Sequence, residues 1–391
     1  MRMDLPSKHV QYLCRRIGAR GAGSDGEKAA ASYIMRAMED RGIDVVMDSF
    51  KSHKSDLHSL LLIYLLALLA YPLFLVSYTA SLLLSILVFL TFQMETYTWS
   101  TVSKLLPRSE ASNVVGRVRA EGDMKQRAML VANYDTAKSS PLGMPKAARL
   151  FRPIYILSFA CITVIVLVSI LGQGASLAKV SRHALIVIWL AFSPFPIYLL
   201  LLSLVILWGE LVGRYSPGAN DNASGVGVML SVLSSIASNP LEHTEVWGVA
   251  TARGCAGGRG MVSLLRRYPK QIKEAFIINL DHLGVGQTRI INREGVMLGF
   301  RSSGPLRKLA HTASNKSKDL KAFKGNCRVK KSDAMVALAR GYKAVTIGGL
   351  LGGTYQGWRN EADRFNKIDR KSMDRAVKLV HLLLEEIDNK P

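Results

Sequence analysis

The chain has 391 residues, of which 49% are apolar and 20% charged, and its formal net charge is +22. This length suffices for one large domain or two ordinary ones. The charge would suit nucleic acid, but the sequence has no helix-turn-helix, zinc-finger or aromatic RNA-binding motif, so we predict no nucleic acid partner. The basic excess instead predicts contact with membrane lipids through their anionic headgroups.

Residues 1–56 predict two helices followed by a strand, the N-terminal part of an α/β domain. The helices are expected at 7–19 and 24–42, and the second begins at Ser24 with Glu27 three positions later, a capping-box pattern. The strand is expected at 43–50.

The first of two apolar stretches, residues 57–92, contains no Asp, Glu, Lys or Arg. One helical crossing of a bilayer needs about 20 apolar residues, so this stretch is long for one helix and short for two. Pro72 and the polar run from Ser77 to Ser81 favour a turn. We therefore predict a transmembrane hairpin at 57–93, although a single crossing stays open.

The α/β domain continues over 94–152, with strands expected at 112–119 and 127–133. The second apolar stretch, 153–209, has only Lys179 and Arg182 as charges. It predicts a second transmembrane hairpin at 153–210, made of crossings at Pro153–Gly174 and Ala184–Gly209.

Arginines flank the second hairpin on one side, at Arg149, Arg152 and Arg214. Basic residues next to membrane spans remain in the cytoplasm. The chain is therefore predicted to be a multi-pass cell-membrane protein with both termini and the α/β domain on the cytoplasmic side.

Residues 211–391 return to alternating elements and are predicted to complete the α/β domain. Strands are expected at 245–251, 275–281 and 343–348, a β-rich stretch at 288–300, and helices at 223–237, 258–268, 303–315, 332–340 and 370–387.

Polar loops follow several of these strands, where open α/β sheets place their sites. They are Asn133-Tyr134-Asp135, Pro217 to Gly225 (PGANDNASG), Thr251 to Gly257, Asn279 to Gly284, and Trp358 to Asp363. The aspartates Asp135, Asp221, Asp281 and Asp363 could converge on one site. Equally, such residues cap helices or shape turns.

In the order of these motifs the chain resembles the di-zinc aminopeptidases, family 28 of the metallopeptidases. Residues 17–24 resemble the family's N-terminal element, and PGANDNASG resembles its most specific motif. Asn279 to Asp281, Ser332-Asp333 and Arg359 to Asp363 follow in the family's order. The resemblance implies a three-layer α/β sandwich with a mixed, mostly parallel central sheet, interrupted here by the two hairpins.

The family's di-zinc site is implied only in a degenerate form. Its metal ligands are a His of a His-x-Asp motif, an Asp shared by both metals, a Glu, a later Asp and a late His, and a second Glu is the general base. Position by position, the ligands fall on Asn133, Asp221, Cys255, Asp281 and Arg359, the base falls on Gly254, and the supporting aspartates are Asp135 and Asp363.

These replacements weaken metal binding, because zinc prefers imidazole, thiolate and carboxylate ligands. An asparagine amide is a poor ligand and an arginine stays protonated. We therefore expect no metal cofactor, and we expect Arg359 to neutralise Asp221 and Asp281. Alternation along the strand predicts that His282 points to the opposite face, and Cys255 is expected to be a small residue in a turn.

The main hypothesis is thus a membrane-anchored pseudopeptidase that acts as a scaffold or binding module, with a protein or peptide partner unknown. One alternative is an active membrane metallopeptidase that holds zinc with Asp221, Cys255 and Asp281. Another is a transporter or channel component, which the lack of charged residues within the crossings disfavours.

Overall fold

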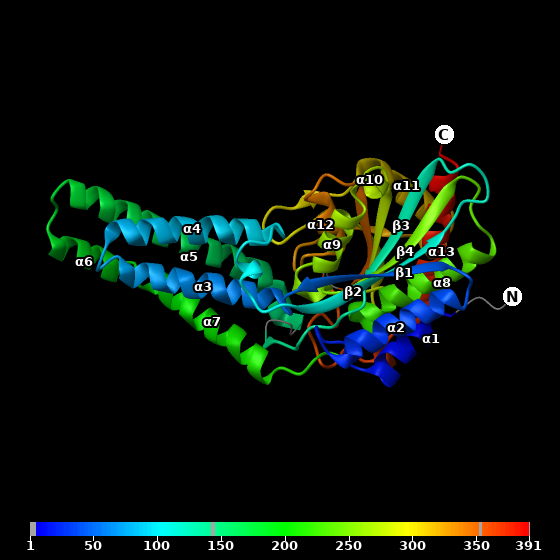
Figure 1. The fold of residues 1–391 in the computed structure, drawn as a ribbon, viewed down its shortest axis with the longest axis horizontal. Coiled ribbons are helices and arrows are strands. Elements are labelled where there is room, and N and C mark those ends of the chain that lie inside the picture. Colours follow the sequence, from blue (N-terminus) through cyan, green and yellow to red (C-terminus); the bar gives the residue numbers. More distant parts are fainter. Residues whose placement is uncertain (1–4, 142–144, 352–353, 391) are drawn as a thin grey trace. The chain divides into compact units, whose positions relative to one another are not determined.

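The computed structural model describes residues 5–141, 145–351 and 354–390. The chain forms two compact units. The sheet unit comprises Met1–Ser55, Arg108–Arg149 and Arg214–Pro391, and the helical unit comprises Asp56–Pro107 and Leu150–Gly213. Two insertions thus build the helical unit, and three separate segments build the sheet unit (Figure 1).

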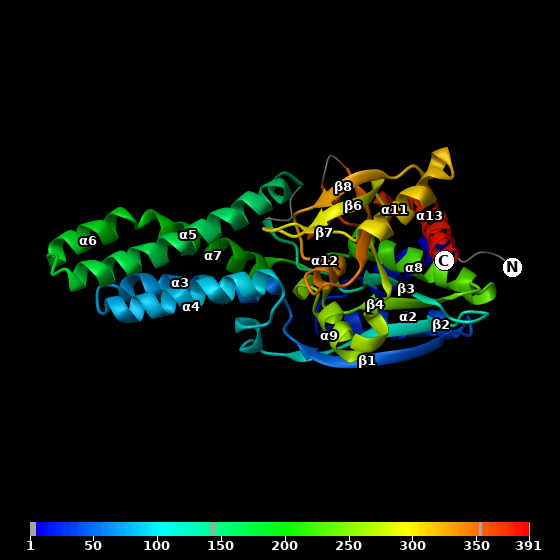
Figure 2. The same ribbon diagram turned by 90° about the horizontal axis from the view of Figure 1, so that it is seen from above.

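The sheet unit is built on one sheet of nine strands in the order β1-β2-β4-β3-β5-β9-β6-β7, with β8 paired to β6. Figure 2 shows β1 at one edge and β6, β7 and β8 together at the other. The strands are β1 (Asp44–Ser52), β2 (Ser109–Val118), β3 (Gln126–Asn133), β4 (Thr244–Thr251), β5 (Phe276–Asp281), β6 (Gln287–Glu294), β7 (Phe300–Arg301), β8 (Phe323–Cys327) and β9 (Ala344–Leu350).

The four central strands run parallel, since β3 pairs in parallel with β4 and β5, and β5 with β9. Antiparallel pairs flank them, with β1 and β2 on one side and β6 and β7 on the other. The carboxyl ends of β3, β4 and β5 therefore meet at one edge, which is where ligands bind in such sheets.

Helices cover both faces of this sheet, and the alternation of strand side chains explains the layers. In β3, Leu130 and Ala132 join one apolar core with helices α1, α2, α8, α11 and α13. Met129 and Val131 join the other core with α9, α10 and α12. Figure 1 shows α1, α2 and α8 on one side and α9, α10 and α12 on the other. The predicted three-layer sandwich with a mixed sheet is confirmed.

The α-helices of this unit are α1 (Pro6–Gln11), α2 (Asp25–Glu39), α8 (Ser224–Ser238), α9 (Arg259–Arg267), α10 (Pro269–Ile272), α11 (Gly304–Asn315), α12 (Asp333–Leu338) and α13 (Arg370–Asp388). Shorter turns are η1 (Tyr12–Ile17), η4 (Ala219–Ala223), η5 (Gly254–Ala256), η6 (Lys318–Leu320) and η7 (Phe365–Lys367). The predicted cap of α2 is confirmed, because the Ser24 hydroxyl accepts a hydrogen bond from the Glu27 N–H at 3.2 Å. The short strand β8 was not predicted.

The helical unit contains α3 (Asp56–Leu73), α4 (Tyr78–Thr96), η2 (Val102–Lys104), most of α5 (Pro145–Leu177), α6 (Arg182–Ala191) and α7 (Pro194–Val212). Four of these helices, α3, α4, α5 and α7, are long and apolar enough to cross a membrane, and α6 is shorter. The structure divides the predicted segment Ala184–Gly209 into α6 and α7. Pro194 begins α7, where its missing N–H leaves no helical hydrogen bond unmade.

Polar contacts hold these helices together while apolar side chains point outward. The Ser81 and Ser169 hydroxyls, on α4 and α5, lie 2.9 Å apart, and the rings of Tyr71 and Trp189 stack. Leu83, at 66% exposed, and Leu201, at 58%, typify the outer surfaces. Exposed leucines on long apolar helices indicate an apolar surrounding, of the kind that a membrane supplies.

Each insertion lies between two residues that pair within the sheet unit. Ser52 at the end of β1 pairs with Ser109 at the start of β2, and the first insertion lies between them. Lys138 forms a bridge with Tyr215, and the second insertion, Leu150–Gly213, lies between these two residues.

Candidate functional site

Polar side chains gather at the carboxyl edge of the central strands. Asn133 ends β3 and Asp281 ends β5, and Asp221 comes from the irregular turn η4 that precedes α8. The amide of Asn222, also in η4, donates to Asn133 Oδ1 at 3.3 Å. Asp221 and Asp281 are both buried. The structure thus brings together the two carboxylates that the sequence singled out as retained metal ligands.

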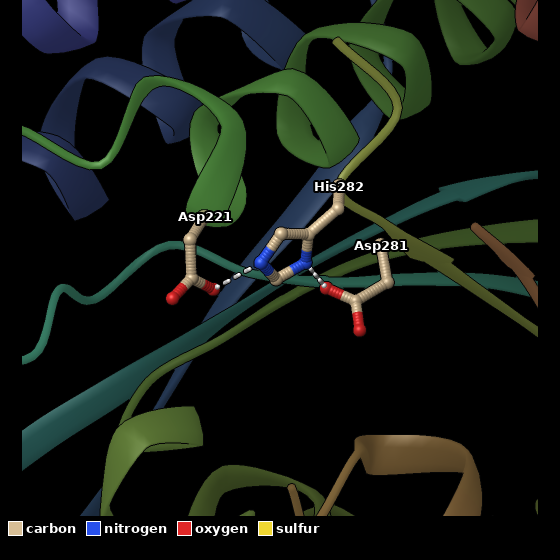
Figure 3. Close-up of side chains that lie close together, drawn as sticks. All are labelled: Asp221, Asp281 and His282. Atoms are coloured by element: carbon tan, nitrogen blue, oxygen red, sulfur yellow. Dashed lines mark hydrogen bonds and ion pairs between the residues drawn. The ribbon is translucent and has the colours of Figure 1, made fainter. Parts of the chain in front are cut away.

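Two basic side chains lie between these carboxylates. The Nδ1 of His282 donates to Asp281 Oδ1 at 2.7 Å, and its Nε2 lies 3.4 Å from Asp221 Oδ1 (Figure 3). The ammonium of Lys330 donates to Asp281 Oδ1 at 2.8 Å and lies 3.6 Å from Asp221 Oδ1. One oxygen of each aspartate therefore faces both an imidazole and an ammonium group.

The position of His282 corrects the prediction that it points away from the site. Strand alternation was the basis of that prediction, but β5 ends at Asp281 and His282 adopts φ 56°, in the left-handed region. This backbone conformation is uncommon for a residue other than glycine. It turns the fully buried imidazole back toward Asp221, where Asn222 Oδ1 accepts a hydrogen bond from the His282 N–H at 3.0 Å.

Lys330 is the cation that the sequence did not reveal, because it comes from the segment between β8 and α12, outside every motif considered. Its side chain is 13% exposed and its ammonium lies 5.3 Å from the ring centre of Tyr355. Burial alone would lower the pKa of Lys330, but the carboxylates of Asp281 and Asp221 raise it well above its ordinary value. Burial alone would raise the pKa of Asp281, but Lys330 and His282 hold it well below its usual range. Both groups are therefore charged at neutral pH.

Arg359 is buried near the site, as expected, but its described hydrogen bond leads elsewhere. Its Nη2 lies 3.5 Å from the carbonyl oxygen of Cys255, a long contact, and its guanidinium stacks over Trp358 at 5.6 Å. Lys330 lies within 4 Å of both aspartates. Lys330 therefore supplies a neutralising charge that the sequence did not predict, and the neutralising role expected for Arg359 stays a prediction.

Asp135 organises a tight turn, η5, beside the aspartates. Its Oδ1 accepts from the N–H of Gly254 at 2.8 Å and its Oδ2 from the N–H of Cys255 at 3.0 Å. The amide of Asn133 donates to the same carboxylate at 3.2 Å. Burial raises the pKa of Asp135, against these hydrogen bonds. In this chain Asp135 thus fixes a backbone turn.

Gly254, at the position that the resemblance gives to the general base, leaves no room for a larger residue. A Cβ added there would lie 2.5 Å from the Cβ of Asn133, closer than non-bonded carbons approach. The neighbouring Cys255 is partly buried, and burial together with Asp135 and Asp221 raises the pKa of its thiol. A thiol that resists ionisation is a weak ligand and a weak nucleophile.

Asp363 fixes the loop that carries Asp221. Its carboxylate accepts from the backbone N–H of Asn220 at 2.9 Å and of Asp221 at 2.9 Å. Burial raises the pKa of Asp363 to about 6. The position of Asp221 therefore depends on Asp363, as the supporting role implied by the resemblance requires.

A buried arginine joins the N-terminal segment to the same region. Arg20 is fully buried, and its guanidinium donates to the carbonyl oxygens of Tyr134 at 2.7 Å, Pro217 at 2.9 Å and Gly218 at 2.8 Å. It also donates to the carbonyl oxygens of Leu13 at 3.2 Å and Gly18 at 2.9 Å. One side chain thus connects the loops on either side of the site.

The donor set does not fit two zinc ions. Neither an asparagine amide nor a guanidinium is a standard zinc ligand, and Gly254 offers no atom. The ligand atoms of Asp221, Asp281 and His282 do lie within 4.8 Å of one another, a group that could hold a single ion. However, the Lys330 ammonium already makes a close contact with Asp281 there.

Comparison with known proteins agrees with this fold. The chain is similar to a leucine aminopeptidase precursor from Bacteroides thetaiotaomicron, at 15% identity and a TM-score of 0.58, covering 100% of this chain and 98% of that one. It is similar to the zinc aminopeptidase BSAP from Bacillus subtilis, at 12% identity, a TM-score of 0.58, and coverage of 99% and 95%. It is also similar to glutaminyl cyclase from Porphyromonas gingivalis, at 13% identity and a TM-score of 0.58, covering 99% of this chain and 98% of that one. No curated protein matches the chain.

The fold is that of the zinc aminopeptidase-like proteins. Residues 207–384 match the model of peptidase family M28. This match over the C-terminal part of the chain, together with the shared fold, supports a relationship to family M28.

Proposed function

We propose that this protein is a membrane-embedded pseudopeptidase, in which an M28 fold serves as a scaffold or binding module without a di-zinc centre. The observation that carries the proposal is the Lys330 ammonium, 2.8 Å from Asp281 and 3.6 Å from Asp221. A lysine supplies a permanent positive charge where a cation is needed to neutralise two buried carboxylates. It supplies neither a Lewis acid nor an activated water.

The surroundings of the aspartates support the loss of peptidase chemistry. Metal-assisted hydrolysis needs a group that takes a proton from the attacking water. At the position of that base stands Gly254, packed so closely against Asn133 that a Cβ does not fit. A single substitution therefore cannot recreate the base without movement of β3.

A second candidate function is hydrolysis at a single metal ion. The convergence of Asp221, Asp281 and His282 favours it, because two carboxylates and an imidazole suit zinc. Binding of a metal ion here requires Lys330 to move away from Asp281. The ligand set predicted from the sequence for an active enzyme contained Cys255, and His282 takes its place in this candidate site.

Metal analysis distinguishes the two candidates. Full-length protein purified in detergent without chelator should carry fewer than about one zinc per chain. Zinc sites use three or four protein ligands, and the Lys330 ammonium competes with zinc for the carboxylates of Asp221 and Asp281. Elemental analysis after dialysis against zinc at neutral pH provides the measurement. One or more tightly bound zinc ions per chain would overturn the pseudopeptidase proposal, and hydrolysis of aminoacyl substrates by that form would establish the second candidate.

We further propose that both insertions cross the membrane an even number of times. Each insertion is flanked by residues that pair within the sheet unit, which supports ends on the same side of the membrane. The four long apolar helices then form two hairpins. Flanking arginines at 149, 152 and 214 support a cytoplasmic sheet unit, in contact with anionic headgroups.

A cysteine at position 180 should report this orientation. In intact cells, Val180→Cys should react with a membrane-impermeant thiol reagent, because the turn between α5 and α6 is expected outside. Lys390→Cys should react only after the cells are opened. The unsubstituted chain, with its four native cysteines, gives the background labelling. Labelling of position 390 but not 180 in intact cells would reverse the orientation.

A further inference from the structure

A second hollow lies in the sheet unit, between the antiparallel edge of the sheet and helix α11. It has a volume of about 1320 Å³ and is lined by residues of β6, β7, β8 and α11. None of the vestigial metal positions contributes to it. We call it the basic pocket, because six of its lining residues are Arg293, Arg301, Arg307, Lys308, Lys324 and Arg328.

The charges of the basic pocket have no acidic partners among the described residues. Among its described lining residues none is acidic, and none of the six cations forms an ion pair within the described chain. The one hydrogen bond of the Arg307 guanidinium leads to the amide oxygen of Asn292 at 3.1 Å, and its buried Nε has no acceptor. Six like charges around one hollow destabilise the fold unless a counter-charge binds there.

Neighbouring groups respond to this concentration of charge. Burial and the nearby Arg301 lower the pKa of Arg307. Burial, Lys324 and Arg307 lower the pKa of His311, which also lines the pocket. Protonation of the imidazole is thus disfavoured by the cations around it, as expected where the local potential is positive.

The start of helix α11 contributes to the same hollow. The helix runs over Gly304–Asn315, and Ser302, Ser303 and Gly304 line the pocket at its N-terminus. The first N–H groups of a helix and its dipole favour anions. The Ser303 side chain does not cap them.

We propose that the basic pocket binds a ligand with two or more phosphate groups. Arginine forks match phosphate oxygens in pairs, and several cations around one hollow suit clustered phosphates. No Phe, Tyr or Trp side chain lines the described part of the pocket, so the large aromatic surfaces on which the bases of single-stranded nucleic acid stack are missing there. The phosphates could belong to a soluble metabolite or to lipid headgroups. The proposal is independent of the metal question at Asp221 and Asp281.

Titration with tripolyphosphate tests the proposal. Full-length protein in neutral detergent should bind tripolyphosphate at one site per chain by calorimetry. A pocket variant with Arg301→Gln, Arg307→Gln and Lys324→Gln should bind at least about tenfold more weakly, since each charge-assisted hydrogen bond contributes to affinity. A control variant with Lys51→Gln, Lys125→Gln and Lys270→Gln removes the same charge from exposed positions outside the pocket and should keep the affinity.

Two further measurements make the result decisive. The pocket variant should melt at the same temperature as the unsubstituted chain or higher, because repulsion is removed, so lost binding cannot be ascribed to unfolding. In nanodiscs of phosphatidylcholine with cardiolipin, whose headgroup carries two phosphates, binding should be weaker than in nanodiscs given the same surface charge by phosphatidylglycerol if lipid phosphates occupy the pocket, and equal if the ligand is soluble. The proposal would be overturned if tripolyphosphate did not bind, or if the pocket and control variants lost the same amount of affinity for it. It would also be overturned if single-stranded RNA bound more tightly than tripolyphosphate and lost affinity in the pocket variant.

Discussion

Replacing Lys330 with alanine should lower the melting temperature of the sheet unit by roughly 6 °C or more when a chelator is present. The ammonium is the close cationic partner of two buried carboxylates, and removing one partner of a buried ion pair costs about 3–5 kcal/mol. Asp281→Asn in the same chain should recover part of the loss, because one uncompensated charge is removed. Circular dichroism or differential scanning fluorimetry in detergent gives the measurement.

Lys343 provides the matched control for this experiment. Its ammonium lies 2.6 Å from Glu274, a pair as close as that of Lys330, but the side chains of Lys343 and Glu274 are 43% and 76% exposed. Lys343→Ala should therefore lower the melting temperature much less than Lys330→Ala does. Zinc should raise the melting temperature of Lys330→Ala, which leaves Asp221, Asp281 and His282 open to a metal, and not that of the unsubstituted chain. A Lys330→Ala protein as stable as Lys343→Ala would show that Lys330 does not take the place of the metal.

Arg20→Met should be at least as damaging, and we expect little folded protein. The guanidinium donates to five carbonyl oxygens, of Leu13, Gly18, Tyr134, Pro217 and Gly218. A methionine of similar length leaves all five without these donors in a buried site, and each buried unsatisfied group costs about 1–3 kcal/mol. Arg20→Lys should recover only part, since an ammonium has three donors and cannot reach in several directions at once.

Arg16, in the same segment, gives the comparison for Arg20. It is exposed, so Arg16→Met and Arg16→Lys should leave stability almost unchanged. Expression yield, gel-filtration profile and melting temperature in detergent are sufficient readouts. If Arg20→Met melts within a degree or two of the unsubstituted chain, then the connection between the N-terminal segment and the site loops contributes little to the fold.

The fold was predictable because its signals are local and repeated. Apolar alternation located the central strands, the Ser24 cap located α2, and two apolar stretches with few or no charges located the long apolar helices. The short strand β8 was missed, because Phe323–Cys327 carries no alternating apolar pattern. The division between α6 and α7 was missed because hydropathy is continuous across the break.

The site was only partly predictable, for reasons that lie in its geometry. Convergence of Asp221 and Asp281 followed from their positions after strands and loops that meet at one sheet edge. The role of His282 depends on one left-handed backbone residue, which no alternation pattern contains. The role of Lys330 depends on a segment distant in the sequence, and lysines are so frequent in this chain that no single one is conspicuous.

The pairing of Ser52 with Ser109 also orders events on the ribosome. Strand β1 is synthesised several seconds before its partner β2, at the usual rate of about 5–20 residues per second. During that delay the nascent chain exposes an unpaired strand edge while the first hairpin enters the translocon. The sheet cannot close until the last segment, from Arg214 onward, is made. On the proposed topology, membrane insertion therefore precedes domain folding, and a chaperone that shields β1 would be expected to raise the yield of folded protein.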